Sequence, residues 1–234
     1  MAEALYMDDC YLTEFEATVK SAKEKKIILD RTAFYPNSGG QLGDQGILER
    51  NGEKFTVANT IKESGEIVHE TDKEGLKQGD RIKGQLDWER RYKQMRYHTA
   101  AHIISGIFNK ETGAMITGNQ LNEDHGRIDF NLEAFDREKM TEYFEKANEI
   151  VRKKLPIKTY YMPREETENH PEIFKLVKQL PDTIKKFRIV DIEGFDRQAD
   201  GGTHVKNTSE VGKIEFIGAE NKGKNNRRVM FRIC

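Results

Sequence analysis

Hydrophobic and polar residues alternate in short runs through the first part of the chain, up to about residue 85. Such runs are typical of half-buried strands, and here Gly, Asn and Asp separate them at intervals of roughly 10 residues. This succession predicts a small antiparallel β-barrel. The runs are FEATVKSA, KKIILD, GGQLGDQGILE, EKFTVANTIKE, GEIVHET and DRIKGQLD.

The period of the pattern changes after Asp87, where apolar residues begin to recur every three to four positions. WERRYKQMRYHTAAHIISGIFNKETG is a predicted helix that Gly113 can close. DREKMTEYFEKANEIVRKKL is a second predicted helix, with Asp136 as its N-cap and Pro156 beyond its end. The apolar positions of the first helix are Tyr92, Met95, Ala100, Ile103, Ile104 and Ile107.

The remaining segments mix strands and helices without strict alternation, which indicates an α+β fold. GRIDFNL, IKTYYM and KFRIVDIEG are predicted strands, PEIFKLVKQL is a predicted short helix, and GKIEFIGAENKGKNNRRVMFRIC is a predicted terminal hairpin. We therefore expect two domains, a β-barrel over residues 1–87 and a second domain over residues 88–234.

Charge is almost balanced, with 39 Lys and Arg against 40 Asp and Glu. No global field attracts an anionic partner, so a nucleic acid would have to be bound by a local basic cluster. Two clusters qualify, and a solvated protein face explains either equally well. One is Lys222, Lys224, Arg227 and Arg228; the other is Arg90, Arg91, Lys93 and Arg96.

Cysteine usage and the absence of long apolar runs indicate a reducing compartment. Cys10 and Cys234 lie at opposite ends of the sequence and form no CxxC pair. No run approaches the roughly 18 apolar residues of a membrane span, and acidic residues stand where a signal peptide would be basic. The cytoplasm is the expected location.

Three histidines suggest a metal site. His98 and His102 are four residues apart on the first predicted helix, so both imidazoles can reach one ion, although such pairs also occur on many helix surfaces. His204 lies in a glycine-lined loop, and three histidines with one open position suit a catalytic Zn²⁺. A tight turn with positive φ also explains Gly201 and Gly202.

Asp200, four residues before His204, has three possible roles. It could ligate the metal, orient a ligating imidazole through a hydrogen bond, or start the turn. The sequence leaves these alternatives open.

Three motifs in this order resemble the editing domain of alanyl-tRNA synthetases and their free-standing relatives, the AlaX proteins. They are FYPNSGGQLGDQG, HTAAHII and GGTHV, and RIDF and GKNNRRVMFRI agree with them. The resemblance extends from about Thr32 to the last residue. Because an alanine-activating domain does not fit in 234 residues, we expect the free-standing form, of the medium-sized class.

The resemblance implies a translation-factor-like barrel followed by an α/β two-layer editing domain with one Zn²⁺ per chain. The implied ligands are His98, His102 and His204, with Asp200 where the family motif has Cys. A carboxylate is a harder donor than a thiolate but is compatible with Zn²⁺, and water could also take this position.

The implied reaction is the trans-editing hydrolysis of the aminoacyl ester of Ser-tRNA(Ala), and of Gly-tRNA(Ala), which serves translation fidelity. A charging site discriminates poorly against a smaller substrate or one added hydroxyl, so a second hydrolytic site is the usual remedy. Zinc would activate a water or anchor the substrate amine, and no side chain is assigned as catalytic.

The substrate pocket implied by the resemblance draws on three segments, and for the first glycines a tight barrel turn is an equal explanation. Strand and turn chemistry explains Thr117 and Gln120 as well. The partner is the acceptor end of tRNA(Ala), no membrane contact is expected, and a monomer is the default assembly. The pocket residues are Gly39, Gly40, Gln41, Asp44, Thr117, Gln120, Gly201, Gly202 and Thr203.

Two other functions fit the same residues. One is a zinc-dependent hydrolase of a small ester or amide, which would not need the basic clusters. The other is a non-catalytic tRNA-binding module whose structural zinc has four ligands and no open position.

Overall fold

A computed structural model describes residues 2–134, 136–177 and 183–234 of the chain. They form two compact units, one up to Gln94 and one from Met95 to Cys234. Helix α1 (Trp88–Thr112) begins where the sequence analysis placed the second domain, and its first residues belong to the first unit. Among the described residues, no helix is long and apolar enough to cross a membrane.

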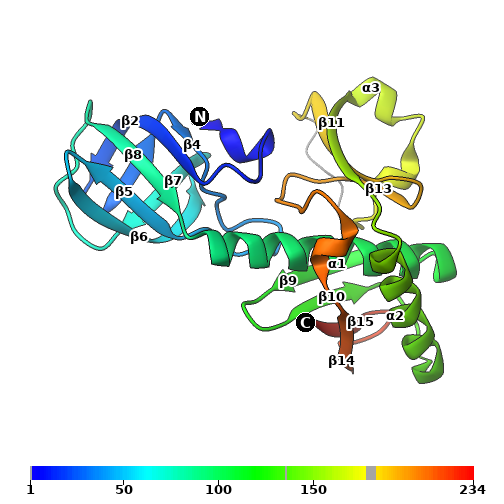
Figure 1. Cartoon of the computed structure of the whole chain (residues 1–234). Coiled ribbons are helices and arrows are strands. Elements are labelled where there is room, and N and C mark those ends of the chain that lie inside the picture. Colours follow the sequence, from blue (N-terminus) through cyan, green and yellow to red (C-terminus); the bar gives the residue numbers. More distant parts are fainter. Residues whose placement is uncertain (1, 135, 178–182) are drawn as a thin grey trace. The chain divides into compact units, whose positions relative to one another are not determined.

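The first unit is a closed β-barrel, which confirms the prediction from the alternating pattern (Figure 1). Its strands close in the order β2-β3-β7-β6-β5-β8. A short parallel pair, β1 (Glu3–Ala4) with β4 (Arg31–Thr32), accompanies the barrel, and η1 (Leu5–Met7) follows β1. The barrel strands are β2 (Glu14–Lys23), β3 (Lys26–Leu29), β5 (Gly46–Arg50), β6 (Glu53–Glu63), β7 (Glu66–Thr71) and β8 (Arg81–Leu86).

Alternate residues of the barrel strands fill its core. In β2, Phe15, Ala17 and Val19 are buried while their neighbours face outward. Burying a Phe or Val side chain contributes about 1.5–3 kcal/mol. Gly84 on β8 makes room for the Phe15 ring, since a Cβ there would lie 2.4 Å from Phe15 Cε1.

The second unit contains two antiparallel sheets, ordered β14-β15-β10-β9 and β11-β12-β13. The terminal hairpin β14–β15 and the strand over GRIDF are present as predicted. The elements of this unit after α1 are β9 (Ile116–Leu121), β10 (Gly126–Phe130), α2 (Arg137–Arg152), β11 (Ile157–Pro163), α3 (Arg164–Thr167), η2 (Pro171–Ile173), β12 (Lys186–Ile192), β13 (Asp196–Ala199), η3 (Thr208–Val211), β14 (Ile214–Asn221) and β15 (Arg227–Ile233).

Helix α1 contacts both sheets. Its Phe108 ring stacks on Phe130 of β10, with centroids 4.4 Å apart. On another side, Gly106 lies against Phe195 and Asp196, where an added Cβ would meet both at 3.0–3.1 Å. Contact on both sides explains why residues 97–106 are buried without interruption, instead of along one stripe.

The helix ends follow the predicted signals. Gly113 has φ 72° directly after α1, a backbone conformation that glycine adopts without strain. The Asp136 carboxylate accepts hydrogen bonds from the backbone of Glu138 and Lys139 at the start of α2.

The predicted helix over PEIFKLVKQL is wrong for its described part. Only Pro171–Ile173 form a single 3₁₀ turn, and residues 178–180 lie outside the described residues. Ile116 N donates to Lys175 O, and Val177 N donates to Ile116 O, so this segment extends along β9. Pairing with a strand edge overrides the helical spacing of the apolar residues.

Candidate metal centre

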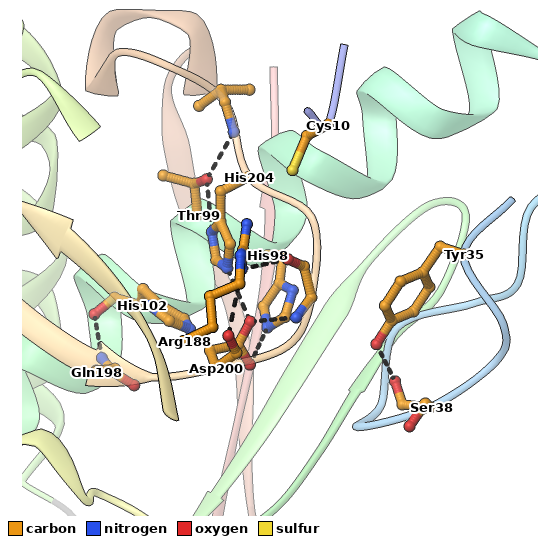
Figure 2. Close-up of polar contacts among 12 residues, drawn as sticks. Cys10, Tyr35, Ser38, His98, Thr99, His102, Arg188, Gln198, Asp200 and His204 are labelled. Carbon is orange, nitrogen blue, oxygen red and sulfur yellow. Dashed lines mark hydrogen bonds and ion pairs between the residues drawn. The ribbon is translucent and has the colours of Figure 1, made fainter. Parts of the chain in front are cut away.

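Four side chains of the second unit converge in one place, and they are the four that the sequence analysis proposed as ligands. Figure 2 shows the imidazoles of His98, His102 and His204 around the Asp200 carboxylate. One possible ligand atom from each residue lies within 4.8 Å of all the others. His98 and His102 come from α1, whereas Asp200 and His204 come from the loop after β13.

The helix supplies two imidazoles because residues four apart lie one turn above each other. The ring centroids of His98 and His102 are 5.1 Å apart. The His204 ring lies 4.3 Å from the first and 4.4 Å from the second, centroid to centroid. All three histidines are buried, so the cluster is shielded from bulk solvent.

The loop brings in Asp200 through a short turn. Asp200 Oδ2 accepts a hydrogen bond from the backbone N–H of Gly202, 2.5 Å away. A Cβ on Gly202 would lie 2.2 Å from His98 Cε1, so only glycine fits against this imidazole. Positive φ is not the reason for the glycine pair, since neither Gly201 nor Gly202 has it; close approach requires the second.

Two distances in the cluster are close to those between donors in a tetrahedral zinc site. Bonds of 2.0–2.1 Å in tetrahedral geometry place neighbouring donors about 3.3 Å apart. His204 Nε2 lies 3.2 Å from Asp200 Oδ2, and His98 Nε2 lies 3.6 Å from Asp200 Oδ1. Three imidazole nitrogens and a carboxylate oxygen also suit this ion chemically.

Burial keeps the imidazoles neutral. Removal from water lowers the pKa of His98, lowers that of His102 well below its ordinary value, and lowers that of His204 to about 4. Burial alone would raise the pKa of Asp200, but its histidine neighbours hold it well below the ordinary value. At neutral pH the cluster therefore offers three lone pairs and one negative charge, the protonation state that a metal requires.

Three further residues surround the cluster, and the sequence analysis missed them. Thr99 Oγ1 lies 3.1 Å from His204 Nδ1 and accepts from Val205 N. Gln198 donates to the backbone O of His102, which fixes a ligand-bearing turn of α1. Arg188 donates to two carbonyls of the loop. Thr99 stands between the two histidines of the motif, whereas no sequence signal marks the other two.

The glycines of the predicted pocket in the first unit form a tight turn. Gly39 and Gly40 have φ 58° and 84°, and Ser38 and Gln41 exchange backbone hydrogen bonds across them. Two consecutive positive φ values favour glycine at both positions. Gln41 is fully buried.

Asp44, in the same segment, lies inside the first unit. Its carboxylate pairs with Arg91 and accepts from Tyr35 N, and the two charged side chains are 1% and 0% exposed. Arg91 donates hydrogen bonds to both carboxylate oxygens. Asp44 therefore fixes the conformation of the FYPNSGGQLGDQG segment. Arg91 is therefore no phosphate contact, contrary to the expectation for the basic residues of the helix.

Thr117, Gln120 and Thr203, also predicted as pocket residues, lie in the second unit. Thr117 Oγ1 donates to Asn226 Oδ1, and Gln120 pairs with Arg127 in the register of β9 and β10. Thr203 is fully buried beside His204 in the loop. Thr203 lies in the loop that carries Asp200 and His204, and the other two lie on β9.

The four predicted tRNA-binding cations gather on the terminal hairpin. Arg228 makes two hydrogen bonds to the Asp129 carboxylate, and Arg227 donates to Asn221 and Gly223 of the turn. Lys222 lies 3.7 Å from Glu220, and Lys224 is exposed at the turn. The arginines therefore stabilise the hairpin, while the lysines reach outward from it.

Comparison with known proteins gives the same assignment in both units. The family tRNA synthetases class II (A) matches residues 3–90, and the threonyl and alanyl tRNA synthetase second additional domain matches residues 187–230. The chain is 35% identical to the alanine–tRNA ligase of Thermococcus kodakarensis over 97% of its own length, which is 25% of that enzyme.

Full-length similarity is found to shorter proteins. The alanyl-tRNA editing protein AlaX-M of Methanosarcina barkeri is 49% identical, and that of Saccharolobus solfataricus is 42% identical. Each alignment covers 100% of this chain and 99% of the relative. The chain therefore belongs to the AlaX-M family of alanyl-tRNA editing proteins.

Proposed function

We propose that this protein is a zinc-dependent trans-editing deacylase that hydrolyses the aminoacyl ester of Ser-tRNA(Ala) and of Gly-tRNA(Ala). The observation that carries the proposal is the buried cluster of three neutral imidazoles and one carboxylate, in a chain of the AlaX-M family. His98, His102, His204 and Asp200 would hold one Zn²⁺. Zinc in this position supplies a Lewis acid, for a water or for the amine of the substrate.

The chain's own residues give this site its selectivity for a small substrate group. Gly201 has open space where a side chain would begin, so an aminoacyl group could approach the backbone there. Gly202 and Thr203 line the same loop, and we assign all three to the pocket. Serine differs from alanine by one hydroxyl and glycine by one missing methyl, so packing contacts discriminate them poorly. Hydrogen bonds from this loop to the serine hydroxyl would have to provide the preference for serine over alanine.

The other pocket residues stay predictions. We assign Gly39, Gly40 and Gln41 to substrate contact through the backbone of their turn, and Thr117 and Gln120 as polar contacts from β9. Asp44 would support this pocket indirectly, since its ion pair with Arg91 fixes the segment that contains Gly39, Gly40 and Gln41.

The proposed partner is the acceptor end of tRNA(Ala). Lys222 and Lys224 on the terminal hairpin would contact phosphates directly, and Arg227 and Arg228 would place them there. Each phosphate neutralised by a lysine releases counterions, so binding should weaken as salt rises.

A deacylation assay with Ser-tRNA(Ala), Gly-tRNA(Ala) and Ala-tRNA(Ala) tests the proposal. We expect the parent protein to hydrolyse the serine ester faster than the correct alanine ester. Chelation or His102→Ala should abolish hydrolysis, because both remove the metal. His170→Ala is the matched control, since His170 lies outside the cluster and contacts Glu172 and Arg197 instead.

The alternatives give different results. Equal hydrolysis of the alanine and serine esters would contradict editing. Hydrolysis of small esters that tRNA does not inhibit would indicate a small-molecule hydrolase. Zinc and tRNA binding without any hydrolysis would indicate a binding module.

A further inference from the structure

Arg188 is a buried cation next to the ligand-bearing loop. It lies on β12, its side chain is 4% exposed, and Figure 2 shows it directed at the Asp200 turn. Its Nη1 donates to the carbonyl oxygens of Asp200 and Gly202, at 3.2 and 2.9 Å. Its own carbonyl accepts from Asp200 N at 2.9 Å. One residue thus grips the loop at both ends of the glycine turn.

The loop needs these hydrogen bonds because its glycines allow many backbone conformations. Glycine loses more conformational freedom on folding than any other residue, and Gly201 has no neighbour within 4 Å of a Cβ position. A buried carbonyl without a donor costs about 1–3 kcal/mol, so removing the guanidinium favours other loop conformations. Asp200 and His204 would move with the loop, away from the helix histidines.

A cation in this place also has an opposing effect. Like charge near a bound metal repels it, so on electrostatics alone loss of Arg188 would tighten zinc binding. Guanidinium stays charged at every accessible pH, so titration does not relieve this repulsion. The two effects have opposite signs, and the measured direction therefore decides which of them matters.

We propose that Arg188 is a positioning residue of the metal centre: by clamping the carbonyls of Asp200 and Gly202, it holds Asp200 and His204 where they complete the site with His98 and His102. This inference rests on the proposed zinc site. It adds a role for Arg188, which lies on β12 and outside the loop that carries Asp200 and His204.

Zinc affinity, measured by competition with a chelator, tests the proposal in Arg188→Met and Arg188→Lys. Met keeps an unbranched apolar stem but removes the donors, and we expect zinc affinity to fall by about 10–100-fold, the usual effect of losing a residue that orients a ligand. Lys keeps the charge and the donors on a shorter chain, so its affinity should lie between Met and parent.

Arg164→Met is the matched control. Arg164 also donates to a backbone carbonyl, that of Ile184, and lies over the Phe187 ring of the same sheet. Its replacement should lower stability at most, and zinc affinity should stay at the parent value. Thermal unfolding of each variant without metal establishes that the fold is retained.

If Arg188→Met binds zinc as tightly as the parent or more tightly, Arg188 is not a positioning residue. The proposed metal site would still stand in that case, because the parent binds zinc. A parent that binds no zinc would remove the metal site and the inference together. A kinetic readout separates positioning from substrate contact. At saturating zinc, we expect Arg188→Met to regain the parent kcat on Ser-tRNA(Ala) with unchanged KM, and a persistent loss of kcat would contradict the proposal.

Discussion

The contacts of Asp200 fit two of the three roles that its position allows, starting the turn and ligating a metal. One oxygen starts the turn by accepting from Gly202 N, and both oxygens face histidine nitrogens, Oδ2 that of His204 and Oδ1 that of His98. A cysteine at this position would keep the negative charge but replace the oxygen with a softer sulfur. We therefore expect cysteine to serve in place of Asp200 at the proposed metal site, but the turn bond to Gly202 uses a carboxylate oxygen.

Substitutions at Asp200 should separate these roles. We expect Asp200→Cys to bind zinc about as tightly as the parent, because thiolate suits Zn²⁺. Asp200→Asn keeps the turn bond without the charge and should lose about 10–100-fold in affinity. Asp200→Ala loses both and should bind most weakly, although three histidines remain.

Competition with a chelator gives these affinities, and thermal unfolding without metal reports the turn. If Asn matches the parent in zinc affinity, Asp200 only starts the turn and is no ligand.

Helical spacing, the glycine-lined loop and the family resemblance together were sufficient to propose the four converging residues, but not the side chains that support them. Helical geometry alone places His98 and His102 on one face, and this could be read from the sequence. The loop is held by Arg188, which lies on a neighbouring strand 12 residues before Asp200. No local sequence pattern indicates that Arg188 donates to the carbonyls of Asp200 and Gly202. Such contacts follow from tertiary structure.

At the scale of elements, periodicity predicted the regular segments and failed where pairing partners decide. EKFTVANTIKE coincides with β6, because alternation and β-branched residues agree there. In contrast, the helical pattern after Pro171 gives way to an extended segment beside β9, and β13 (Asp196–Ala199) was not predicted at all. Both depend on a strand elsewhere in the sequence.

Strand β7 carries a buried histidine, His69, whose protonation would destabilise the folded barrel. The His69 Nδ1–H donates to Ile27 O, so Nε2 accepts from the Thr32 hydroxyl. Burial lowers the pKa of His69 to about 4. Below its ordinary value of 6.5, the unfolded chain takes up a proton that the folded barrel excludes.

The barrel should therefore lose about 3 kcal/mol of stability through His69 as pH falls from 6.5 towards 4, with the full contribution present above 6.5. Urea unfolding of the parent and of His69→Gln at several pH values measures this, and the variant should show a shallower slope. Parallel slopes for parent and His69→Gln would disprove the assignment.

At the scale of the molecule, each unit has interactions of its own that fix its internal structure. The barrel has an apolar core and the Asp44–Arg91 pair, whose disruption would cost about 3–5 kcal/mol. All four candidate ligands lie in the second unit. A metal that binds there stabilises that unit directly, by about 4 kcal/mol at a free concentration of roughly 1,000 Kd.

Removal of zinc should thus loosen one unit selectively. We expect chelation to accelerate amide hydrogen exchange in peptides from α1 beyond Met95 and from residues 196–208, while peptides from the barrel strands keep their rates. Mass spectrometry of exchange with and without chelator checks this, and His102→Ala without chelator should reproduce the pattern. A uniform change in both units would contradict it.

The closure of the barrel has a consequence for aggregation. Because the barrel strands β2, β3, β5, β6, β7 and β8 pair in a ring, they offer no row of free backbone groups to a neighbouring molecule. The four-stranded sheet of the second unit is open, with β14 at its border, where Phe216 and Ile217 are 36% and 45% exposed. The register shift between Phe216 and Gly218 interrupts the regular ladder at these two side chains. Since bulges disfavour the addition of a strand at a sheet edge, we expect a variant that straightens this one to precipitate at concentrations where the parent stays dissolved.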